Sequence, residues 1–572
     1  MNDISGFFYS DKQIAFLGLG EAGGKANGLK FIEDFLKEDF NKDEFPEFEV
    51  TIPKMIVLKT DIFDEFMESN DLYEIALSDI PDNRKALIFQ NADLPFHILG
   101  ELRKIVVETK KPLAIRSSSQ LEDAKFEPFA GIYGTKMTPN NQIESDIRFR
   151  KLVEAIKFVY ASTFFDEARN YLAATKHNAE DEKMAVIIQE VVGEDFGEQF
   201  YPHISGVARS YNYYPSGGAT PEEGVVNLAM GLGKTIVDGG TSWAYSPASP
   251  MKGPPFKSMG HMLRDTQLNF WGVRMKGEIE YDPINEKEYL MESHFADVEG
   301  NKPLSKIFST YNPESDRIWP GKSKGQHIIT FAPILQDYDT KFNDLIKRLL
   351  KLSEKATGSP VEIEFAVSLS EDTSKKPHRF GFLQVRPMVV SYESIELKED
   401  ELFGENVVLA SDTVLGNGVI DNINDVVFVK KEAFDTKNTR KIAKEIDSVY
   451  KKLLKDGRKC LLIGYGRWGT TDDWAGIPVD WSNISAAKVI AEVGLINVIQ
   501  EMSQGSHFFH NVTSFKVHYF SIPYNSDYGI DWGWLNENEL VEETNFIRHM
   551  RLEKPLMVKT DGRTGKGVVL KG

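Results

Sequence analysis

Apolar and polar residues alternate most regularly along residues 361–388, where two β-rich runs flank a polar stretch. This pattern predicts a β-hairpin with a long loop. Neighbouring side chains on a strand point to opposite faces, so Glu362 and Glu364 share one face of the first run, and the apolar residues beside them can be buried on the other. In the second run the same alternation places three residues on one face, namely Phe382, Gln384 and Arg386.

The polar faces of these two runs predict a binding site if they coincide. Glu362, Glu364, Gln384 and Arg386 would then bring two carboxylates, an amide oxygen and a guanidinium to one place. Oxygen ligands suit Mg²⁺, and an arginine can donate two parallel hydrogen bonds to a phosphate. The alternative is the solvated polar face of an ordinary half-exposed hairpin.

Other elements follow from the periodicity of apolar residues. Short apolar runs predict strands at residues 55–58, 113–115, 184–192 and 460–463. Apolar residues at helical spacing predict helices at residues 145–178, 342–356 and 438–455. Residues 241–330 are rich in proline, glycine and aromatic residues and show no clear periodicity.

The composition narrows the class of protein. The chain has 572 residues, of which 41% are hydrophobic and 27% charged, so length alone predicts three or four domains with sizeable cores. A net charge of −19 argues against binding of nucleic acid, which needs a basic surface. The single cysteine, Cys460, excludes an intrachain disulfide and favours a reducing compartment. We expect a cytoplasmic protein that does not enter the membrane, because the sequence shows neither a signal-peptide pattern nor a run of 18 apolar residues.

A glycine-rich turn near the start offers two interpretations. Gly18, Gly20 and Gly23 spell GxGxxG after an apolar run, which is the dinucleotide-binding fingerprint and the basis for a dinucleotide-dependent oxidoreductase hypothesis. The acidic residue expected about 20 positions later, at the end of a second strand, is replaced by a polar stretch. A flexible turn that presents Lys25 is therefore the simpler interpretation, and a solvated lysine at a helix start is the alternative.

A second polar turn follows the strand at residues 113–115. It delivers Arg116 and three hydroxyl groups, Ser117 to Ser119, and four consecutive polar side chains need partners if they are covered. Arg116 can pair with phosphate, with the hydroxyls as neutral donors. Gly131 and Gly134, just before Thr135, would let the backbone approach a ligand closely. A serine-rich surface turn with an ion-paired arginine fits the pattern equally well.

Two stretches downstream complete the predicted site. The end of the strand at residues 184–192, from Gln189 to Val191, can pair edgewise with a flat ring. Residues 225–240 alternate apolar strand with paired glycines, which fit tight turns beside a ligand, the hinges of a lid, or ordinary hairpin turns.

The order and spacing of these motifs resemble the nucleotide-binding domain of the phosphoenolpyruvate synthase and pyruvate phosphate dikinase family. The resemblance covers about residues 15–390 and rests on GGKANG, LAIRSSSQLED, FAGIYGT, IIQEVV, SGVA, GLGKTIVDGG, EIEFAV and FLQVRPM. It implies an α+β fold of the ATP-grasp type, in which two lobes close over ATP and Mg²⁺. Lys234 departs from the family, which often has an acidic residue at this place.

The resemblance also implies roles for single residues. Three cationic residues correspond to phosphate contacts and to a catalytic role: Lys25, Arg116 and Arg386. Two residues resemble the Mg²⁺ ligands: Glu364 and Gln384. Glu362 resembles a carboxylate near the ribose or the metal, and residues 189–191, with Gln189 and Val191, resemble an adenine-binding edge strand. Ser117 and Thr135 complete the predicted nucleotide-binding set.

The remainder, residues 396–572, is similar to the family's phosphohistidine domain only in outline. Strands, a glycine pair and a block ending in Ser506 and His507 follow in a comparable order. His507 would take the place of the phosphorylated histidine at a helix start, where a helix N-terminus stabilises an added phosphoryl group. The usual threonine and small residues of that block are absent, Phe508 and Phe509 would crowd the site, and His510 is an alternative. The family's pyruvate-binding barrel is missing, so pyruvate is not assumed to be a substrate.

These expectations combine into one hypothesis. The chain is predicted to hold a first ATP-grasp lobe at residues 1–200, a second lobe at 201–395 and a smaller α/β domain at 396–572. It is expected to act as an ATP-dependent, dikinase-like phosphotransferase whose partners are a nucleotide and an unidentified small-molecule or protein acceptor. The alternative is a regulatory module that binds ATP without turnover and acts through a protein partner. The oligomeric state, a homo-oligomer among the options, is left open.

Overall fold

A computed structural model gives the fold of the chain. It describes residues 3–572 except 123–128, 130, 176, 216–218, 252–258, 278, 280–281, 299, 322, 391–394, 396, 471–473 and 496–505. The chain divides into two compact units. The N-terminal unit comprises residues 1–210, 222–236 and 241–388, and the C-terminal unit comprises residues 211–221, 237–240 and 389–572.

The first sheet of the N-terminal unit has five strands in the order β1-β3-β6-β4-β5. Its strands are β1 (Ile14–Leu17), β3 (Met55–Leu58), β4 (Leu113–Ser119), β5 (Thr135–Thr138) and β6 (Met184–Glu190). Only β1 and β3 pair in parallel, and the other neighbours are antiparallel. The sheet is therefore mixed, unlike the parallel sheet of a dinucleotide-binding domain.

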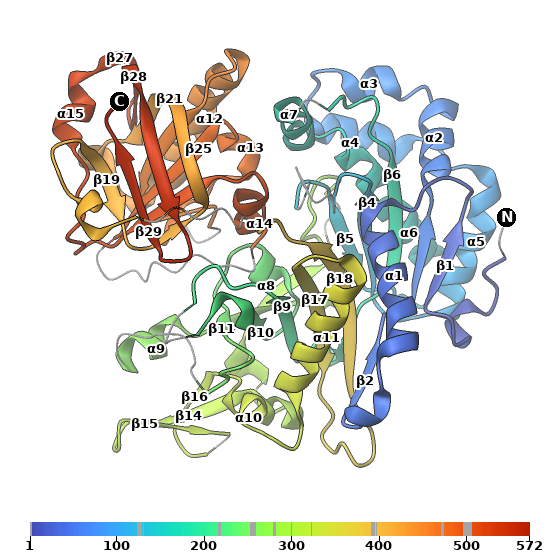
Figure 1. The fold of residues 1–572 in the computed structure, drawn as a ribbon. Helices are drawn as coiled ribbons and strands as arrows, with labels where there is room; N and C mark the ends of the chain where they lie inside the picture. Colours follow the sequence, from blue (N-terminus) through green and yellow to red (C-terminus); the bar gives the residue numbers. More distant parts are fainter. Residues whose placement is uncertain are drawn as a thin grey trace. The chain divides into compact units, whose positions relative to one another are not determined.

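Helices from the first two hundred residues surround this sheet (Figure 1). They are α1 (Gly23–Asp39), α2 (Thr60–Ser69), α3 (Tyr73–Leu77), α4 (Asp82–Asn91), α5 (Phe96–Glu108), α6 (Ser145–Ser162) and α7 (Asp166–Ala174). Helix α6 buries one side against β4, β5, α4 and α5. The strands predicted at residues 55–58, 113–115 and 184–192 and the helical region at 145–178 are confirmed.

The second sheet of this unit has six strands in the order β11-β10-β9-β17-β18-β2. Its strands are β2 (Phe48–Thr51), β9 (Ile204–Arg209), β10 (Val225–Ala229), β11 (Trp243–Tyr245), β17 (Val361–Ser368) and β18 (His378–Pro387). Helix α11 (Phe342–Thr357) packs on β17 and on α1 (Figure 1). Because α1 also contacts β4 and β18, it joins the two sheets, and one apolar core runs through both.

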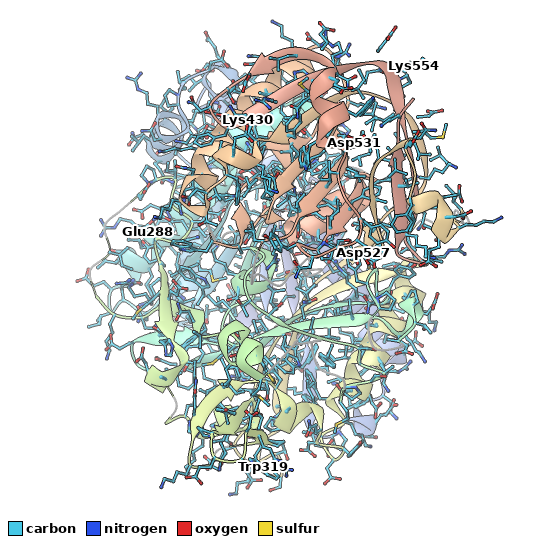
Figure 2. All side chains as sticks on the ribbon, turned by 90° about the vertical axis from the view of Figure 1, so that its left-hand side faces the viewer. Glu288, Trp319, Lys430, Asp527, Asp531 and Lys554 are labelled. Atoms are coloured by element: carbon cyan, nitrogen blue, oxygen red, sulfur yellow. The ribbon has the colours of Figure 1, made fainter. Side chains whose placement is uncertain are left out.

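Short elements cover the remainder of the N-terminal unit. A four-stranded sheet contains β7 (Glu194–Asp195), β8 (Gln199–Tyr201), β12 (Asn269–Arg274) and β13 (Leu290–His294). A three-stranded sheet contains β14 (Phe308–Asn312), β15 (Arg317–Pro320) and β16 (Gln326–Ile329). Three short helices accompany them: α8 (Lys234–Val237), α9 (Met259–Asp265) and α10 (Ala332–Leu335). Residues 241–330, which show no periodicity in sequence, thus form small sheets and turns, with half-exposed Trp319 on β15 (Figure 2).

The C-terminal unit is built on a nine-stranded sheet in the order β19-β29-β28-β21-β22-β25-β26-β20, with β27 beside β28. Its strands are β19 (Val407–Ser411), β20 (Val414–Leu415), β21 (Asn417–Val429), β22 (Cys460–Tyr465), β25 (Ala487–Val493), β26 (His518–Ile522), β27 (Glu539–Glu543), β28 (Ile547–Asp561) and β29 (Lys566–Leu570). The central strands β21, β22, β25 and β26 are parallel. A short parallel pair, β23 (Arg467–Trp468) and β24 (Gly476–Ile477), follows β22.

Helices connect the parallel strands, namely α12 (Thr439–Lys455), α13 (Trp481–Ile484) and α14 (His507–Ser514), and α15 (Trp532–Glu537) precedes β27. The helix predicted at 438–455 is confirmed as α12. Surface ion pairs join Lys430 to Glu543 at 3.0 Å and Lys571 to Asp531 at 2.8 Å; Lys430 and Asp531 are marked in Figure 2.

The predicted α+β class is confirmed. The three-part division of the chain stays a prediction, and β2, from the first 200 residues, lies in the second sheet rather than the first. Within the described part of the chain, no helix combines the length and apolar character needed to cross a bilayer.

Candidate functional site

The hairpin of β17 and β18 brings its polar residues face to face. In the antiparallel register Glu362 lies opposite Arg386 and Glu364 opposite Gln384. Directly opposed side chains on one face are close enough to interact. The sequence prediction that the two polar faces coincide is therefore confirmed for these four residues.

A β-bulge corrects one part of that prediction. The register shifts between Glu364 and Phe365, so that Phe365 pairs with Phe382 and Leu383 is the extra residue. A bulge reverses the alternation of faces along the strand. Phe382 was expected beside Gln384, but it lies in the apolar core with Phe365. The expectation was wrong because strict alternation cannot anticipate an inserted residue.

Arg116 links the first sheet to the second. From the middle of β4 its guanidinium donates to the amide oxygen of Gln384 at 2.8 Å and to the carbonyl of Leu383, the bulge residue, at 3.1 Å. Glu364 lies 3.7 Å from the same guanidinium. The bulge thus aims a backbone acceptor at a residue 267 positions away in sequence. Two predicted site residues from separate sheets are in direct contact here.

Behind this contact lies a buried arginine pair. Arg386 donates to Glu364 at 2.7 Å and lies 3.4 Å from Glu362. Glu362 also accepts a 2.6 Å hydrogen bond from Arg209 on β9, which is opposite it in the register. Only 2% of Arg209 and of Arg386 is exposed. We name these six residues the inter-sheet cluster: Arg116, Arg209, Glu362, Glu364, Gln384 and Arg386.

Arg209 was missed by sequence reasoning. It ends the stretch SGVAR, whose alternation of small and apolar residues marks it only as a strand. A buried charge in such a strand needs an ionic partner, because an isolated charge is costly to remove from water. Arginine at the end of an otherwise buried strand is the signal that could have identified it.

Lys25 forms a separate pair on the first sheet. It lies in the first turn of α1, where its ammonium contacts Glu122 and lies 3.4 Å from the Ser117 hydroxyl. Ser117 donates to the same Glu122 carboxylate at 2.9 Å. Glu122 is 1% exposed and was not singled out in the sequence, where it is one acid in a polar turn. Lys25 and Ser117 are thus brought together, through an acid that sequence reasoning overlooked.

The packing at the start of α1 explains why residue 23, the last glycine of GxGxxG, is a glycine. A Cβ at Gly23 would lie 1.6 Å from the carbonyl oxygen of Ser118, so only glycine allows the helix to pack on β4. The Ser118 hydroxyl accepts from the N–H of Ala26 at 3.1 Å and donates to the Ala22 carbonyl at 2.9 Å. These contacts fix the position of Lys25 against the first sheet.

Gly18 and Gly20, the other two glycines of GxGxxG, pack against the carboxylate of Asp61. The backbone N–H groups of Leu19 and Gly20 donate to Asp61 at 2.8 and 2.9 Å. A Cβ at Gly18 or Gly20 would collide with Asp61 or its neighbour Thr60. In a dinucleotide-binding turn these donors would face a pyrophosphate. An internal carboxylate takes that place here, which argues against the oxidoreductase hypothesis.

Gln189 and Thr135 both lie beside Arg116. The amide oxygen of Gln189 is 3.4 Å from the Arg116 guanidinium, and Thr135 is directly opposite Arg116 in the register of β4 and β5. The backbone N–H of Thr135 donates to Glu286 at 2.9 Å. Gln189 and Thr135 therefore lie beside one guanidinium, whereas Ser117 pairs with Glu122 and Lys25.

The expected edge strand at residues 189–191 is corrected. Strand β6 lies between β3 and β4 and is not at an edge. The backbone N–H of Glu190 donates to the Lys54 carbonyl at 3.0 Å, and that of Val191 donates to the Pro112 carbonyl at 2.9 Å. Apolar residues dominate β6, and a central strand buried on both faces shows the same pattern as an edge strand beside a ligand. The adenine-binding role of Gln189 and Val191 stays a prediction.

His507 lies in the C-terminal unit as the first residue of α14, as the sequence predicts. The Ser506 hydroxyl caps the helix by accepting from the N–H of Phe509 at 3.2 Å. Phe508 and Phe509 are buried and anchor α14 instead of lying open at its start. Residues 503–505 of the predicted block lie outside the described residues.

Arg467 and Trp468, in the glycine turn after β22, have different surroundings. Trp468 is buried and its indole N–H donates to the Ala491 carbonyl at 3.3 Å, so it packs. The Arg467 guanidinium lies 3.4 Å from the Gly239 carbonyl. Ser506 also lies beside Gly239, because a Cβ on that glycine would be 3.8 Å from the Ser506 Cβ. The start of α14 therefore borders two glycine turns of the same unit.

The donor set of the inter-sheet cluster fits a magnesium polyphosphate. Glu362, Glu364 and Gln384 supply the hard oxygen ligands that Mg²⁺ takes, and Arg116 and Arg386 supply guanidinium groups suited to phosphate. The Glu364 side chain is 14% exposed, so it borders solvent while Glu362 does not. Glu364 is thus the oxygen donor of this set that borders solvent, and Gln384, which is 1% exposed, lies directly opposite it.

These features define an α+β protein with a charge-rich junction between two sheets. Residues 19–406 match the family model described as pyruvate phosphate dikinase, AMP/ATP-binding domain. The match covers more than half of the 572-residue chain, and the chain belongs to this family. It therefore carries an AMP/ATP-binding domain, as the sequence motifs indicated. A search of curated proteins found no match.

Proposed function

We propose that the N-terminal unit binds ATP with Mg²⁺ between its two sheets and that the protein is an ATP-dependent phosphotransferase. The observation that carries this proposal is the convergence of Arg116, Gln384, Glu364 and Arg386 from separate sheets. Phosphoryl transfer requires mainly positioning and electrostatic stabilisation, which such a cluster supplies. The fold proposed for this unit is ATP-grasp.

The residues divide into three roles in this proposal. Lys25, Arg116 and Arg386 contact phosphate oxygens, and Glu364 and Gln384 hold the metal ion, which when bound neutralises charge on the phosphates. Ser117, Thr135, Gln189, Val191 and Glu362 complete the nucleotide site. Because Arg116 donates to Gln384 here, nucleotide binding would exchange this amide oxygen for a phosphate oxygen at the guanidinium. Arg209 holds Glu362 in position.

The phosphoryl acceptor is proposed to be His507 or a bound small-molecule or protein acceptor. His507 begins α14, where helix N-terminal groups favour an added negative charge, and imidazole is a competent nucleophile near neutral pH. His510, one turn later, is buried, and its backbone N–H donates to the carbonyl of Ser506. His507 is therefore the better placed of the two.

The test is incubation with ATP labelled in its β-phosphate. In a dikinase-like transfer the histidine nitrogen takes the β-phosphoryl group, AMP leaves, and water takes the γ-phosphoryl group as phosphate. Such a phosphohistidine would leave acid-labile label on the protein, and His507→Ala would remove it while His510→Asn retains it. Label that persists in both variants would point to another acceptor. Arg386→Gln is expected to abolish labelling, and Arg379→Gln, on the same strand but paired near Glu194 and Gly193, is the matched control.

The second candidate is a sensor that binds ATP without turnover. One observation favours it: the proposed phosphate contacts Lys25 and Arg386 each have a carboxylate partner within the protein. A nucleotide would have to replace these internal pairs, which is how a ligand shifts a protein between two states. Saturable ATP binding without AMP, ADP or label would support the sensor and contradict the transferase.

A further inference from the structure

The C-terminal unit contains a cavity at the start of β21. Its volume is about 230 Å³. Its walls are Tyr211, Tyr213, Val389, residues 414–420, Thr513, residues 516–518 and Gly562. Sites for drug-sized ligands usually measure about 300–1,000 Å³, so this cavity suits a smaller molecule. Every lining residue lies in the C-terminal unit, and the cavity is therefore separate from the inter-sheet cluster.

Glycines in the wall keep the cavity open. Gly416 and Gly418, which flank Asn417 at the start of β21, have φ values of +104° and +122°, a region that other residues rarely adopt. A Cβ at Gly416 would lie 2.8 Å from the ring of His518. Gly562 donates its N–H to the Asn417 side chain at 2.8 Å. The backbone itself thus forms this wall, and side chains at these glycines would fill or distort it.

Aromatic rings form another wall. The Tyr213 hydroxyl donates to the Val389 carbonyl at 2.9 Å, and its ring lies edge-on to the ring of Phe509 at 5.4 Å. Tyr211 packs edge-on against Tyr213 at 5.1 Å. Rings fixed in this way present apolar surface to a ligand without further ordering of the side chain.

The polar groups in the wall are few and carry one charge. Lys516 is exposed, and no carboxylate occurs among the lining residues. No ion pair is formed by the Lys516 ammonium within the described part of the chain. His518 is buried with its Nδ1 2.9 Å from the Thr560 hydroxyl, and burial lowers its pKa to about 4, so it is neutral at pH 7. The lining therefore carries one positive charge, in a chain with a net charge of −19.

We infer that the cavity binds a small organic monoanion, a carboxylate whose compact apolar body lies against Tyr211, Tyr213 and the valines and whose charge pairs with Lys516. Thr513 and His518 provide neutral hydrogen-bonding groups beside that charge. An apolar pocket with a few convergent polar groups is the usual form of a small-molecule site. The inference goes beyond ATP binding and does not depend on it.

Binding of named probes to the full-length protein tests the inference. Benzoate, phenylacetate and 3-methylbutanoate are titrated by calorimetry and ligand-observed NMR, each beside its neutral amide. At least one acid is expected to bind about tenfold or more tightly than its amide, the scale of one charge-assisted hydrogen bond. If no acid binds at millimolar concentrations, or if acid and amide bind equally, the inference is wrong.

Two variants locate the binding. Lys516→Asn removes the charge at a position with φ +52°, which asparagine tolerates, and should abolish the preference for the acid. Val419→Trp fills the mouth from a side chain that is 54% exposed, so folding should survive, and binding should be lost. Lys554→Gln, at an exposed position on β28 (Figure 2), is the control and should change neither. Acid binding that persists in Val419→Trp would place the site elsewhere and overturn the inference.

Discussion

Two clusters of buried charge, one in each unit, use similar residues and differ in what they connect. In the C-terminal unit Asp425 accepts from His549 at 2.8 Å and from Arg458 at 2.7 Å, and Arg551 lies 3.5 Å away. These residues lie on β21 and β28 or just before β22, all within one sheet. The inter-sheet cluster instead joins β4 of one sheet to β9, β17 and β18 of another.

The difference separates a structural cluster from a candidate site. Burial alone would raise the pKa of Asp425, but hydrogen bonds from His549 and Arg458 outweigh it and leave that pKa below its ordinary value. Asp425 is thus a stable anion with partners fixed by one sheet. Partners on two sheets can separate when the sheets move, and a ligand can then take the place of one of them. We therefore expect substitutions in the first cluster to affect stability and substitutions in the second to affect nucleotide chemistry.

Glu364→Gln should have the largest effect, and it tests most directly whether the inter-sheet cluster is a nucleotide site. It keeps the shape of the side chain and removes one carboxylate next to Gln384 and Arg386. Loss of electrostatic stabilisation by a single group typically costs about 10²–10³-fold, and a metal ligand at least as much, so ATP turnover is expected to fall about a thousandfold. Nucleotide products are measured by chromatography. Glu371→Gln, on the hairpin loop and paired with Lys302 at 2.8 Å, should be unaffected; equal losses in both variants would contradict the assignment.

Asp425→Ala should destabilise the protein without changing ATP binding. Removing one partner of a buried ion pair leaves the others uncompensated and costs about 3–5 kcal/mol. The free energy of unfolding of the C-terminal unit is measured by urea denaturation, and ATP affinity of the folded protein by calorimetry. Asp421→Ala, an exposed acid on the same strand, is the control. An altered ATP affinity together with unchanged stability would reverse the roles of the two clusters.

Acid should destabilise the N-terminal unit more than the C-terminal unit. Burial lowers the pKa of His203 to about 3 and of His378 to about 4 in the first, and of His518 to about 4 in the second. Each is neutral when folded and takes up a proton when unfolded below about pH 6.5. The contribution of each histidine to the free energy of unfolding is therefore fully present above pH 6.5. It falls as the pH drops toward 4, by about 3 kcal/mol per histidine at most. Asp425 loses its own contribution only below about pH 3.9.

Calorimetric unfolding between pH 7 and 4 measures this dependence. The Nδ1 atoms of His203 and His378 accept the N–H groups of Leu369 and Ser370 at 3.0 and 2.8 Å, and protonation would remove these acceptors. In His378→Asn an amide oxygen can replace the acceptor and does not titrate. This variant should have a flatter pH dependence, and an unchanged curve would show that His378 is not responsible.

Lys25→Ala should have a smaller effect on ATP than Glu364→Gln, and it also removes the ammonium partner of the buried Glu122 carboxylate. The lysine is one of several phosphate contacts, and a lost charged hydrogen bond weakens ATP binding about 10–100-fold. Lys30→Ala is the matched control on the same helix, since Lys30 pairs with Asp34 on the exposed side. Binding is measured by calorimetry with ATP and Mg²⁺. If the two variants bind ATP equally, Lys25 belongs to the first sheet's structure and not to its site.

The hairpin and its facing charges could be predicted because alternation along a strand fixes which residues share a face. Arg116 could be suspected from its polar turn, but its contact with Gln384 joins residues 268 positions apart, and no local pattern encodes it. Glu122 and Arg209 were missed because a single acid in a polar turn, or a single arginine ending an apolar strand, has no periodicity of its own. The hydrogen bond from Gly20 to the Asp61 carboxylate could not be predicted either, because the two residues lie 41 positions apart.

The extra residue at Leu383 sets which residues of β18 face the core and supplies a backbone contact between the two sheets. On one side of it the aromatic residues Phe380 and Phe382 face the core, and on the other side Gln384 and Arg386 face the opposite way. Deleting Leu383 would leave Phe365 opposite Phe382 and Glu364 opposite Gln384, as consecutive pairs of a regular hairpin, but it would remove the backbone carbonyl that accepts from Arg116. A deletion at Leu383 should therefore weaken the contact between the two sheets more than a substitution of its side chain, because it is the backbone of Leu383 that contacts Arg116.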